Sequence, residues 1–332
     1  TGSGKSEFLR TLVTSLAISC PPDRLSFVLV DFKGGSAFGS VARLPHVAGL
    51  VTDLDEHLVE RALRSLRAEL RRREAIFAGA GARDLEDHER RRAPDDERVA
   101  RLVVVIDELR ALVDEFPHFV SGLVRIAALG RSLGVHLVLA TQRPSGVVSA
   151  EVQANVNLRI ALRVRDRADS VDVIDHPGAA LLPVSAPGRA MARGGDGELT
   201  TFQCAALTSE ARSTRPHLEV VGRRGAAGSP AGPPGPGAPA VGPTTGASGA
   251  GGARDAPRDP AAPLVAAIRT AHARRGVALP PVPWRPPLPT LVGFGTVRAG
   301  PTDPDGGPAV ALVDVPDRQE VDLLGPPRRG CW

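Results

Sequence analysis

The first twelve residues, TGSGKSEFLRTL, contain the second half of a phosphate-binding loop. In the pattern GxxxxGK[ST], Gly4, Lys5 and Ser6 supply the last three positions, and the first glycine would precede Thr1. Glycine lets backbone N–H groups turn towards the phosphates, and the following helix presents its positive N-terminus to the same anion. Lys5 would then neutralise the β- and γ-phosphates of ATP, and the Ser6 hydroxyl would bind Mg²⁺. The predicted nucleotide-binding residues are Thr1, Gly2, Ser3, Gly4, Lys5, Ser6 and Glu7.

A pair of acids about a hundred residues later argues against a chance run of small residues. The segment LVVVIDE places Asp107 and Glu108 where an apolar strand ends. We expect Asp107 to hold Mg²⁺ through water and Glu108 to orient and deprotonate the attacking water. The alternative is that both acids only cap the helix that follows. Lys5 and Glu108 are therefore predicted catalytic residues, and Ser6 and Asp107 predicted metal ligands.

The next predicted strand ends in ATQRP, which offers Thr141 and Gln142 at the adjacent strand end. A polar side chain there can contact the γ-phosphate or the attacking water, and we include Gln142 among the candidate catalytic residues. The alternative is an ordinary turn before Pro144.

The apolar pattern predicts strands and helices that alternate from Thr1 to about Ala206, which is typical of an α/β fold with a parallel sheet. The expected strands are LSFVLVDF (25–32), VAGLVTD (47–53), RLVVVIDEL (101–109), VHLVLATQ (135–142) and LRIALRV (158–164). Four helices are expected. The first begins at the glycine loop, the second runs from Asp55 to about Phe77, the third runs from after residue 109 to about Leu133, and a short fourth lies near Ala150 to Ala154. The charged stretch 79–98 is predicted to be an exposed excursion.

Composition divides the chain into three parts. Residues 222–263 are rich in Gly, Pro, Ala and Ser, which predicts a disordered linker without a core. Residues 1–221 then form the nucleotide-binding domain, and residues 264–332 contain a predicted helix, an extended segment and one strand with a polar tail, VALVDVPDRQEVDLL.

Charge and cysteine content are less informative. The net charge is +4, but 41 basic residues, of which two are lysine, are spread among 37 acids, so the excess is weak evidence for nucleic-acid binding. The three cysteines lack metal-ligand spacing, which predicts reduced thiols in a cytosolic protein. No apolar run reaches the roughly 18 residues that span a bilayer. We nevertheless expect a fragment of a longer chain, whose flanks could carry a membrane anchor.

Five separated motifs together resemble the FtsK/SpoIIIE motor domain from Thr1 to about Ala206: TGSGKSEFLRTL, LVDFKGGSAF, LVVVIDEL, LVLATQRPSGVVSAEVQANVNLRIALRV and RADSVDVID. Within the family, DFKGGSAF and VTDLD are most similar to the EccC-type ATPases of type VII secretion and related actinobacterial proteins. WRPPLP (284–289) and ALVDVPDRQ (311–319) resemble the segment that leads into a second FtsK-like module. The long Gly/Pro insertion before them departs from the family pattern.

The resemblance implies a RecA-like P-loop NTPase that assembles into a ring, often a hexamer, with ATP and Mg²⁺ between neighbouring subunits. Such sites are usually completed by an arginine of the next subunit, for which Arg159 is the candidate, followed by Arg163 and Arg143. Lys33, Gly34 and Gly35 would lie near the site, and Asn155, Asp169 and Ser170 match family positions without a derived role.

The predicted function is that of an ATP-hydrolysing ring translocase that moves a polymer. A secreted polypeptide is slightly favoured as cargo, with double-stranded DNA as the alternative and a nucleotide-gated scaffold without turnover as the second alternative. The expected location is the cytoplasm, at the inner face of the membrane, where membrane partners could bind through missing flanks. Because the strand before the loop is missing, the fragment is expected to bind ATP poorly.

Overall fold

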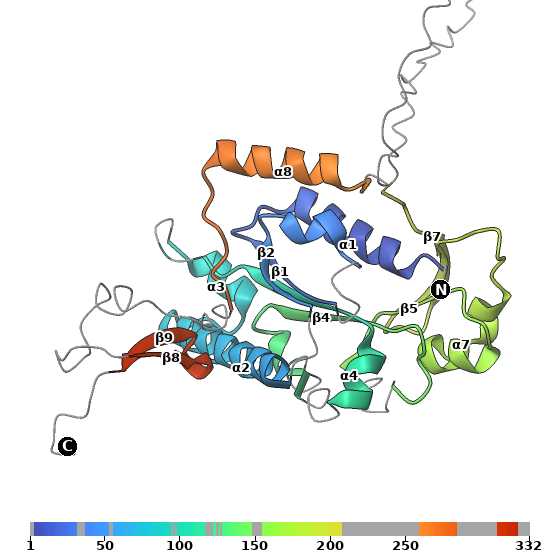
Figure 1. Cartoon of the computed structure of the whole chain (residues 1–332), viewed down its shortest axis with the longest axis horizontal. Helices are drawn as coiled ribbons and strands as arrows, with labels where there is room; N and C mark the ends of the chain where they lie inside the picture. Colours follow the sequence, from blue (N-terminus) through green and yellow to red (C-terminus); the bar gives the residue numbers. More distant parts are fainter. Residues whose placement is uncertain are drawn as a thin grey trace, which may run out of the picture. The chain divides into compact units, whose positions relative to one another are not determined.

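A computed structural model describes residues 3–31, 37–52, 56–93, 96, 98–116, 122–123, 126, 128–147, 155–207, 259–283 and 311–324 of the 332-residue chain (Figure 1). Thr1–Leu207 and Asp259–Trp332 form one compact unit, and Thr208–Arg258 form the other. The second unit lies outside the described residues, and with it most of the predicted linker. Within the described part, no helix is both long enough and apolar enough to cross a membrane.

Four parallel strands form the central sheet. They are β1 (Leu25–Asp31), β2 (Val47–Val51), β3 (Arg101–Asp107) and β4 (Val135–Ala140), in the order β2-β1-β3-β4. The central strands β1 and β3 are buried almost throughout, and for this reason their sequences are continuous apolar runs. Asp31 lies opposite Asp107, and Asp107 opposite Ala140, so the carboxyl ends of three strands meet. The predicted α/β fold with a mainly parallel sheet is confirmed.

Helices cover both faces of this sheet (Figure 1). Successive side chains of a strand point to opposite faces, so Phe27 and Leu29 enter one core while Val28 and Val30 enter the other. The first face carries α1 (Lys5–Ser19), the 3₁₀ helix η1 (Gly39–Arg43) and α8 (Ala262–Arg275), and the second carries α2 (Glu56–Gly79), α3 (Leu85–Arg91) and α4 (Leu109–Glu115). The two cores hold the central strands, and therefore their ends, from both sides.

Helix α3 was not predicted. The sequence predicts an exposed excursion over 79–98, whereas the structure has a helix there with Leu85, Asp87 and His88 buried. The Asp84 carboxylate caps this helix by accepting a hydrogen bond from the Asp87 N–H at 2.7 Å. Three exposed arginines surround the buried Asp87 carboxylate. The high charge density of this stretch wrongly indicated an exposed segment, because the arginines pair with Asp87 while the helix buries its other side.

A second, antiparallel sheet follows the parallel one in the chain. It consists of β5 (Arg159–Leu162), β6 (Arg189–Arg193) and β7 (Leu199–Gln203) in that order, with α7 (Arg167–Ile174) and the 3₁₀ helix η2 (Pro177–Leu181) packed on it. The sequence predicted β5, as the last strand of the alternation, but neither β6 nor β7. Strand β6 is mostly half-exposed and β7 is mostly exposed, so their sequences, RAMAR and LTTFQ, lack the apolar run of a buried strand.

Helix α8 completes the core of the first face. Ala261, just before the helix, and Val265 are buried with residues of α1 and η1. The Asp259 carboxylate accepts a hydrogen bond from the Ser40 N–H at 2.6 Å. Helix α8 belongs to the same compact unit as residues 1–207, and the assignment of residues 264–332 to the start of a second module stays a prediction. The WRPPLP segment lies outside the described residues.

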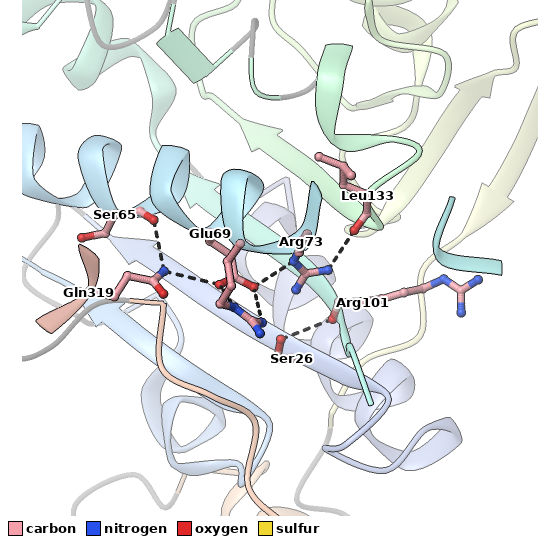
Figure 2. Close-up of polar contacts among 8 residues, drawn as sticks. Ser26, Ser65, Glu69, Arg73, Arg101, Leu133 and Gln319 are labelled. Atoms are coloured by element: carbon pink, nitrogen blue, oxygen red, sulfur yellow. Dashed lines mark hydrogen bonds and ion pairs between the residues drawn. The ribbon is translucent and has the colours of Figure 1, made fainter. Parts of the chain in front are cut away.

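A C-terminal hairpin packs on α2. Its strands β8 (Ala311–Val315) and β9 (Glu320–Leu324) are joined by the 3₁₀ helix η3 (Pro316–Arg318), where the sequence predicted a single strand with a polar tail. Arg61 of α2 binds both carboxylate oxygens of Asp314, one of them at 3.0 Å. The Gln319 amide donates a hydrogen bond to the Ser65 carbonyl at 3.3 Å (Figure 2).

A buried ion pair connects α2 to the turn before β4 (Figure 2). Glu69 and Arg73 are 3% and 2% exposed, and the Arg73 Nε donates to the Glu69 carboxylate at 2.8 Å. The Arg73 Nη1 also donates to the Leu133 carbonyl at 2.9 Å, and Arg72 makes two further bonds to Glu69. Burial alone would raise the pKa of Glu69, but the hydrogen bond from Arg72 and the charge of Arg73 outweigh it and hold the pKa below its ordinary value.

Replacing Glu69 by glutamine should lower the free energy of unfolding near pH 7 by about 3 kcal/mol, because the buried Arg73 charge loses its partner. Since the folded-state pKa of Glu69 is lowered, its carboxylate stabilises the fold above its ordinary pKa, and this contribution disappears as the pH falls through the folded-state pKa. The stability difference between parent and E69Q should therefore shrink below about pH 4.5. Urea unfolding between pH 3 and pH 7 measures it.

Glu60→Gln on the same helix is the matched control. Glu60 pairs with Arg64 in the i,i+4 geometry, but both side chains are about half exposed, so this substitution should cost about 0.5 kcal/mol or less. Equal losses for the two variants would contradict the importance of the buried pair.

Candidate active site

The N-terminus of α1 has the geometry of an anion site. Gly4 occupies the N-cap position with φ +97°, a left-handed conformation that favours glycine, and no side chain of the described residues caps the helix. The N–H groups of the first turn are therefore open to a phosphate. A Cβ on Gly4 would lie 3.0 Å from the Gly188 nitrogen, so the space also excludes a side chain. Thr1 and Gly2 lie outside the described residues.

The structure brings the loop lysine and the strand-end acids together. The Lys5 ammonium forms a hydrogen-bonded ion pair with Asp107 and lies 3.7 Å from the Glu108 carboxylate. Asp107 is 2% exposed, and Lys5 pairs with its buried carboxylate. Lys5 begins α1, and the two acids lie at the end of β3 about a hundred residues later. Because α1 packs on the face of the sheet that contains β3, the three side chains meet.

Glu108 is held in a strained and specific position. Its φ of +67° is left-handed, which costs a non-glycine residue about 1–2 kcal/mol. It stands at the N-cap position of α4, yet its side chain makes no capping hydrogen bond within the described part. The carboxylate instead accepts hydrogen bonds from the Thr141 hydroxyl and the Gln142 N–H, both at 3.4 Å. The helix-capping alternative is therefore not what the structure shows for Glu108.

The two residues after β4 contact the site in different ways. The Thr141 hydroxyl contacts Glu108 and also accepts a hydrogen bond from the Arg143 N–H at 3.2 Å, so it stabilises the turn before Pro144 as well. Gln142 reaches Glu108 with its backbone N–H, and its side chain is exposed. The turn before Pro144 is thus present, and the contact of Gln142 with the γ-phosphate or the attacking water stays a prediction.

Ser6 and Glu7 lie in the first turn of α1 and are both half-buried. Ser6 directly follows Lys5, whose ammonium contacts the two acids. The Glu7 carboxylate accepts a hydrogen bond from the Leu207 N–H at 2.6 Å. One oxygen of Glu7, predicted to bind nucleotide, is thus used to fix the chain that follows β7.

The candidate trans arginines line an open cleft of about 1650 Å³ that runs along the start of α1, β4 and β5. Arg159 of β5 forms an ion pair with Asp175 at 2.8 Å, while Arg163 and Arg143 are exposed. Asn155 and Asp169 also line the cleft. Ser170 is buried and bonded to the backbone of His176 and Ala179, which gives it a structural role.

Sequence reasoning did not single out Asp31 as a site residue. It ends β1 directly opposite Asp107, is fully buried, and its carboxylate accepts a hydrogen bond from the Ala37 N–H at 2.7 Å. It therefore closes the loop that contains Lys33, Gly34 and Gly35, which lie outside the described residues. The signal was present, because Asp31, like Asp107, is an acid at the end of a long apolar run.

These groups fit ATP with Mg²⁺. An open helix N-terminus and a lysine suit phosphates, and a hydroxyl with one or two carboxylates is the protein share of a typical Mg²⁺–nucleotide site. Ser6 and Asp107 could supply those oxygens once Lys5 turns to the phosphates.

Comparisons with known proteins agree with this site. Residues 1–146 match the FtsK/SpoIIIE family model. Over 201 residues the chain is 39% identical to the type VII secretion system protein EssC of Staphylococcus aureus, a match that covers 60% of this chain but 14% of EssC. The structure resembles the cytoplasmic domain of the type VII secretion ATPase EccC of Thermomonospora curvata, with 29% identity and a TM-score of 0.74, over 98% of this chain and 34% of that one.

A second structural match comes from conjugation. The pCW3 conjugation coupling protein TcpA, solved as a monomer with ATPγS, is 26% identical, with a TM-score of 0.55, and covers 63% of this chain and 59% of its own. All these matches are to parts of longer chains.

Replacing Lys5 by methionine should destabilise the ligand-free protein, because the buried Asp107 carboxylate loses its cationic partner. We expect a loss of about 3 kcal/mol in urea unfolding, of which the double variant Lys5→Met/Asp107→Asn recovers about half by removing the charge. Equal stability of the parent and K5M would contradict the ion pair.

Proposed function

We propose, from the match of residues 1–146 to the FtsK/SpoIIIE family model, that this chain binds and hydrolyses ATP. The observation that carries the proposal is the meeting of Lys5, Asp107 and Glu108 beside the uncapped N-terminus of α1. A degenerate module would lack one of these side chains. Here all three are present, together with Ser6.

In the proposed reaction each side chain has one role. Lys5 would exchange its contact with Asp107 for the β- and γ-phosphates, and Asp107 and Ser6 would then hold Mg²⁺. Mg²⁺ supplies neutralisation of the charge that develops on the phosphates. Glu108 orients and deprotonates the attacking water, and its contacts with Thr141 and the Gln142 N–H hold the carboxylate in line.

We further propose that copies of the chain assemble into a ring, such as a hexamer, in which an arginine of one subunit completes the site of the next. Arg159 remains the candidate, and its use would require release from Asp175. Arg163 and Arg143 line the same cleft, and both are exposed. In each case the guanidinium would stabilise charge on the transferred phosphoryl group.

A secreted polypeptide is the favoured cargo, because EssC and EccC are described as type VII secretion proteins. We accordingly place the chain in the cytoplasm at the inner face of a membrane. Double-stranded DNA is the second candidate, supported by the likeness to the conjugation coupling protein TcpA. Because the chain covers 14% of EssC, both proposals concern a larger protein.

Glu108→Gln tests the catalytic role. We expect kcat for ATP to fall at least about 100-fold, because the general base is lost, while the Kd for ATP changes less than about threefold. Phosphate release and calorimetric ATP binding provide the two measurements, with K5M as the variant that loses binding. Normal turnover of E108Q would overturn the assignment, and binding without turnover in the parent would favour the nucleotide-gated scaffold.

The cargo can be distinguished by stimulation of ATPase activity. If polypeptide is the cargo, a short helical secretion substrate should raise kcat, and double-stranded DNA should have no effect. If DNA is the cargo, stimulation should occur with DNA and fall steeply between 50 and 200 mM salt, roughly as expected for release of counterions.

A further inference from the structure

One side of α1 is bound to the second sheet by three polar contacts. The Ser3 carbonyl accepts a hydrogen bond from the Gly188 N–H at 3.0 Å. One turn later, the Glu7 carboxylate accepts from the Leu207 N–H at 2.6 Å, and after one further turn the Thr11 hydroxyl donates to the Ala205 carbonyl at 3.0 Å. Glu7 and Thr11 are four apart in α1 and therefore share one helix face, and Ser3 lies in the loop just before the helix. The phosphate-loop helix is thus fixed along this face by the segments around β6 and β7.

Beside the first of these contacts, Gly4 and Gly188 lie close together. Gly188 has φ +80°, and its nitrogen and Cα would lie 3.0 and 3.1 Å from a Cβ on Gly4. A Cβ on Gly188 itself would lie 3.1 Å from the Gln203 amide nitrogen. The close approach therefore depends on the missing side chain of Gly4, whereas at Gly188 the left-handed backbone is what favours glycine.

The turn that presents Gly188 is itself braced. The Arg189 N–H donates to the Ala186 carbonyl at 3.1 Å, and the Cys204 N–H donates to the Gly188 carbonyl at 2.9 Å. Gln203 donates to the Pro187 carbonyl at 2.9 Å and accepts from the Arg189 guanidinium at 2.9 Å. These contacts with Gln203 at the end of β7 and with Cys204 fix the direction of the Gly188 N–H towards the Ser3 carbonyl.

We propose that Gly188 is a positioning residue for the phosphate loop. By holding the Ser3 carbonyl, it keeps Gly4 in the left-handed conformation that leaves the first-turn N–H groups of α1 facing the phosphates. Gly188 does not touch the reacting atoms and acts through Gly4. The consequence for ATP rests on the proposed function, whereas the effect on the loop does not.

Gly188→Ala is the test, and Gly197→Ala is its matched control. Gly197 lies in the turn between β6 and β7 with a similar φ of +84°, but a Cβ there would meet only the Arg193 side chain, at 3.9 Å, among the described residues. Both substitutions strain a left-handed backbone, so both should lower the melting temperature to a similar extent. Only G188A should loosen the loop.

Two readouts separate positioning from general destabilisation. The Phe8 N–H donates to the Gly4 carbonyl at 2.8 Å, and its hydrogen exchange in the ligand-free chain should be about tenfold faster in G188A and unchanged in G197A. The KM for ATP should rise about tenfold in G188A, with kcat changed less than about twofold. Gly188→Asn keeps the N–H and tolerates a left-handed conformation, so it should restore most of both values.

Equal Phe8 exchange in G188A and G197A would overturn the proposal, as would equal KM values for ATP. Faster exchange in G188A combined with equal ATP binding by the parent and K5M would leave the loop role standing and reject the proposed function instead. If G188A does not fold, Gln203→Ala carries the test, because it removes the brace on Pro187 at an exposed position. Q203A should then speed Phe8 exchange in the same direction, and unchanged exchange would reject the proposal.

Discussion

The ion pair between Lys5 and Asp107 is the interaction on which the rest of the structure depends. Asp107 ends a central strand, is almost completely buried, and needs a cation that the neighbouring strands do not supply. The lysine reaches it because α1 packs on the face of the sheet with its N-terminus at the carboxyl ends of the strands. A buried carboxylate without this partner would cost several kcal/mol, so the fold and the site favour the same arrangement.

Several further features hold this point in place. Asp31 closes the loop after the neighbouring strand, and the turn after β4 holds Glu108 in a backbone conformation that is otherwise unfavourable. Gly188 supports the other side of the loop from the antiparallel sheet. The strained backbone of Glu108 and the buried charge of Asp107 lie where nucleotide is proposed to bind, while the two apolar cores that secure β1 and β3 lie on either side of the sheet.

Much of the fold was predictable because its main signals are local. The buried strands β1 and β3 are unbroken apolar runs, and the amphipathic pattern of α2 identified that helix. The failures also have local causes. The strands β6 and β7 have a half-exposed composition, and α3 has one narrow buried side within a charged sequence. These elements are held by partners distant in the chain. The Leu85 N–H of α3, for example, donates to the Ser132 carbonyl.

The sequence by itself determined the succession of the buried strands along the chain, because each is an apolar run. It also determined the loop lysine and the acids at the strand end, because their positions relative to those runs can be read from the sequence. Only the tertiary structure decided that Glu108 turns away from capping α4, that Arg159 pairs with Asp175, that Glu7 holds Leu207, and that Gly188 meets Gly4. The physical reason is that these outcomes depend on which backbone groups and charges come within a few ångströms. Packing between distant segments sets those distances, and no local pattern in the sequence records them.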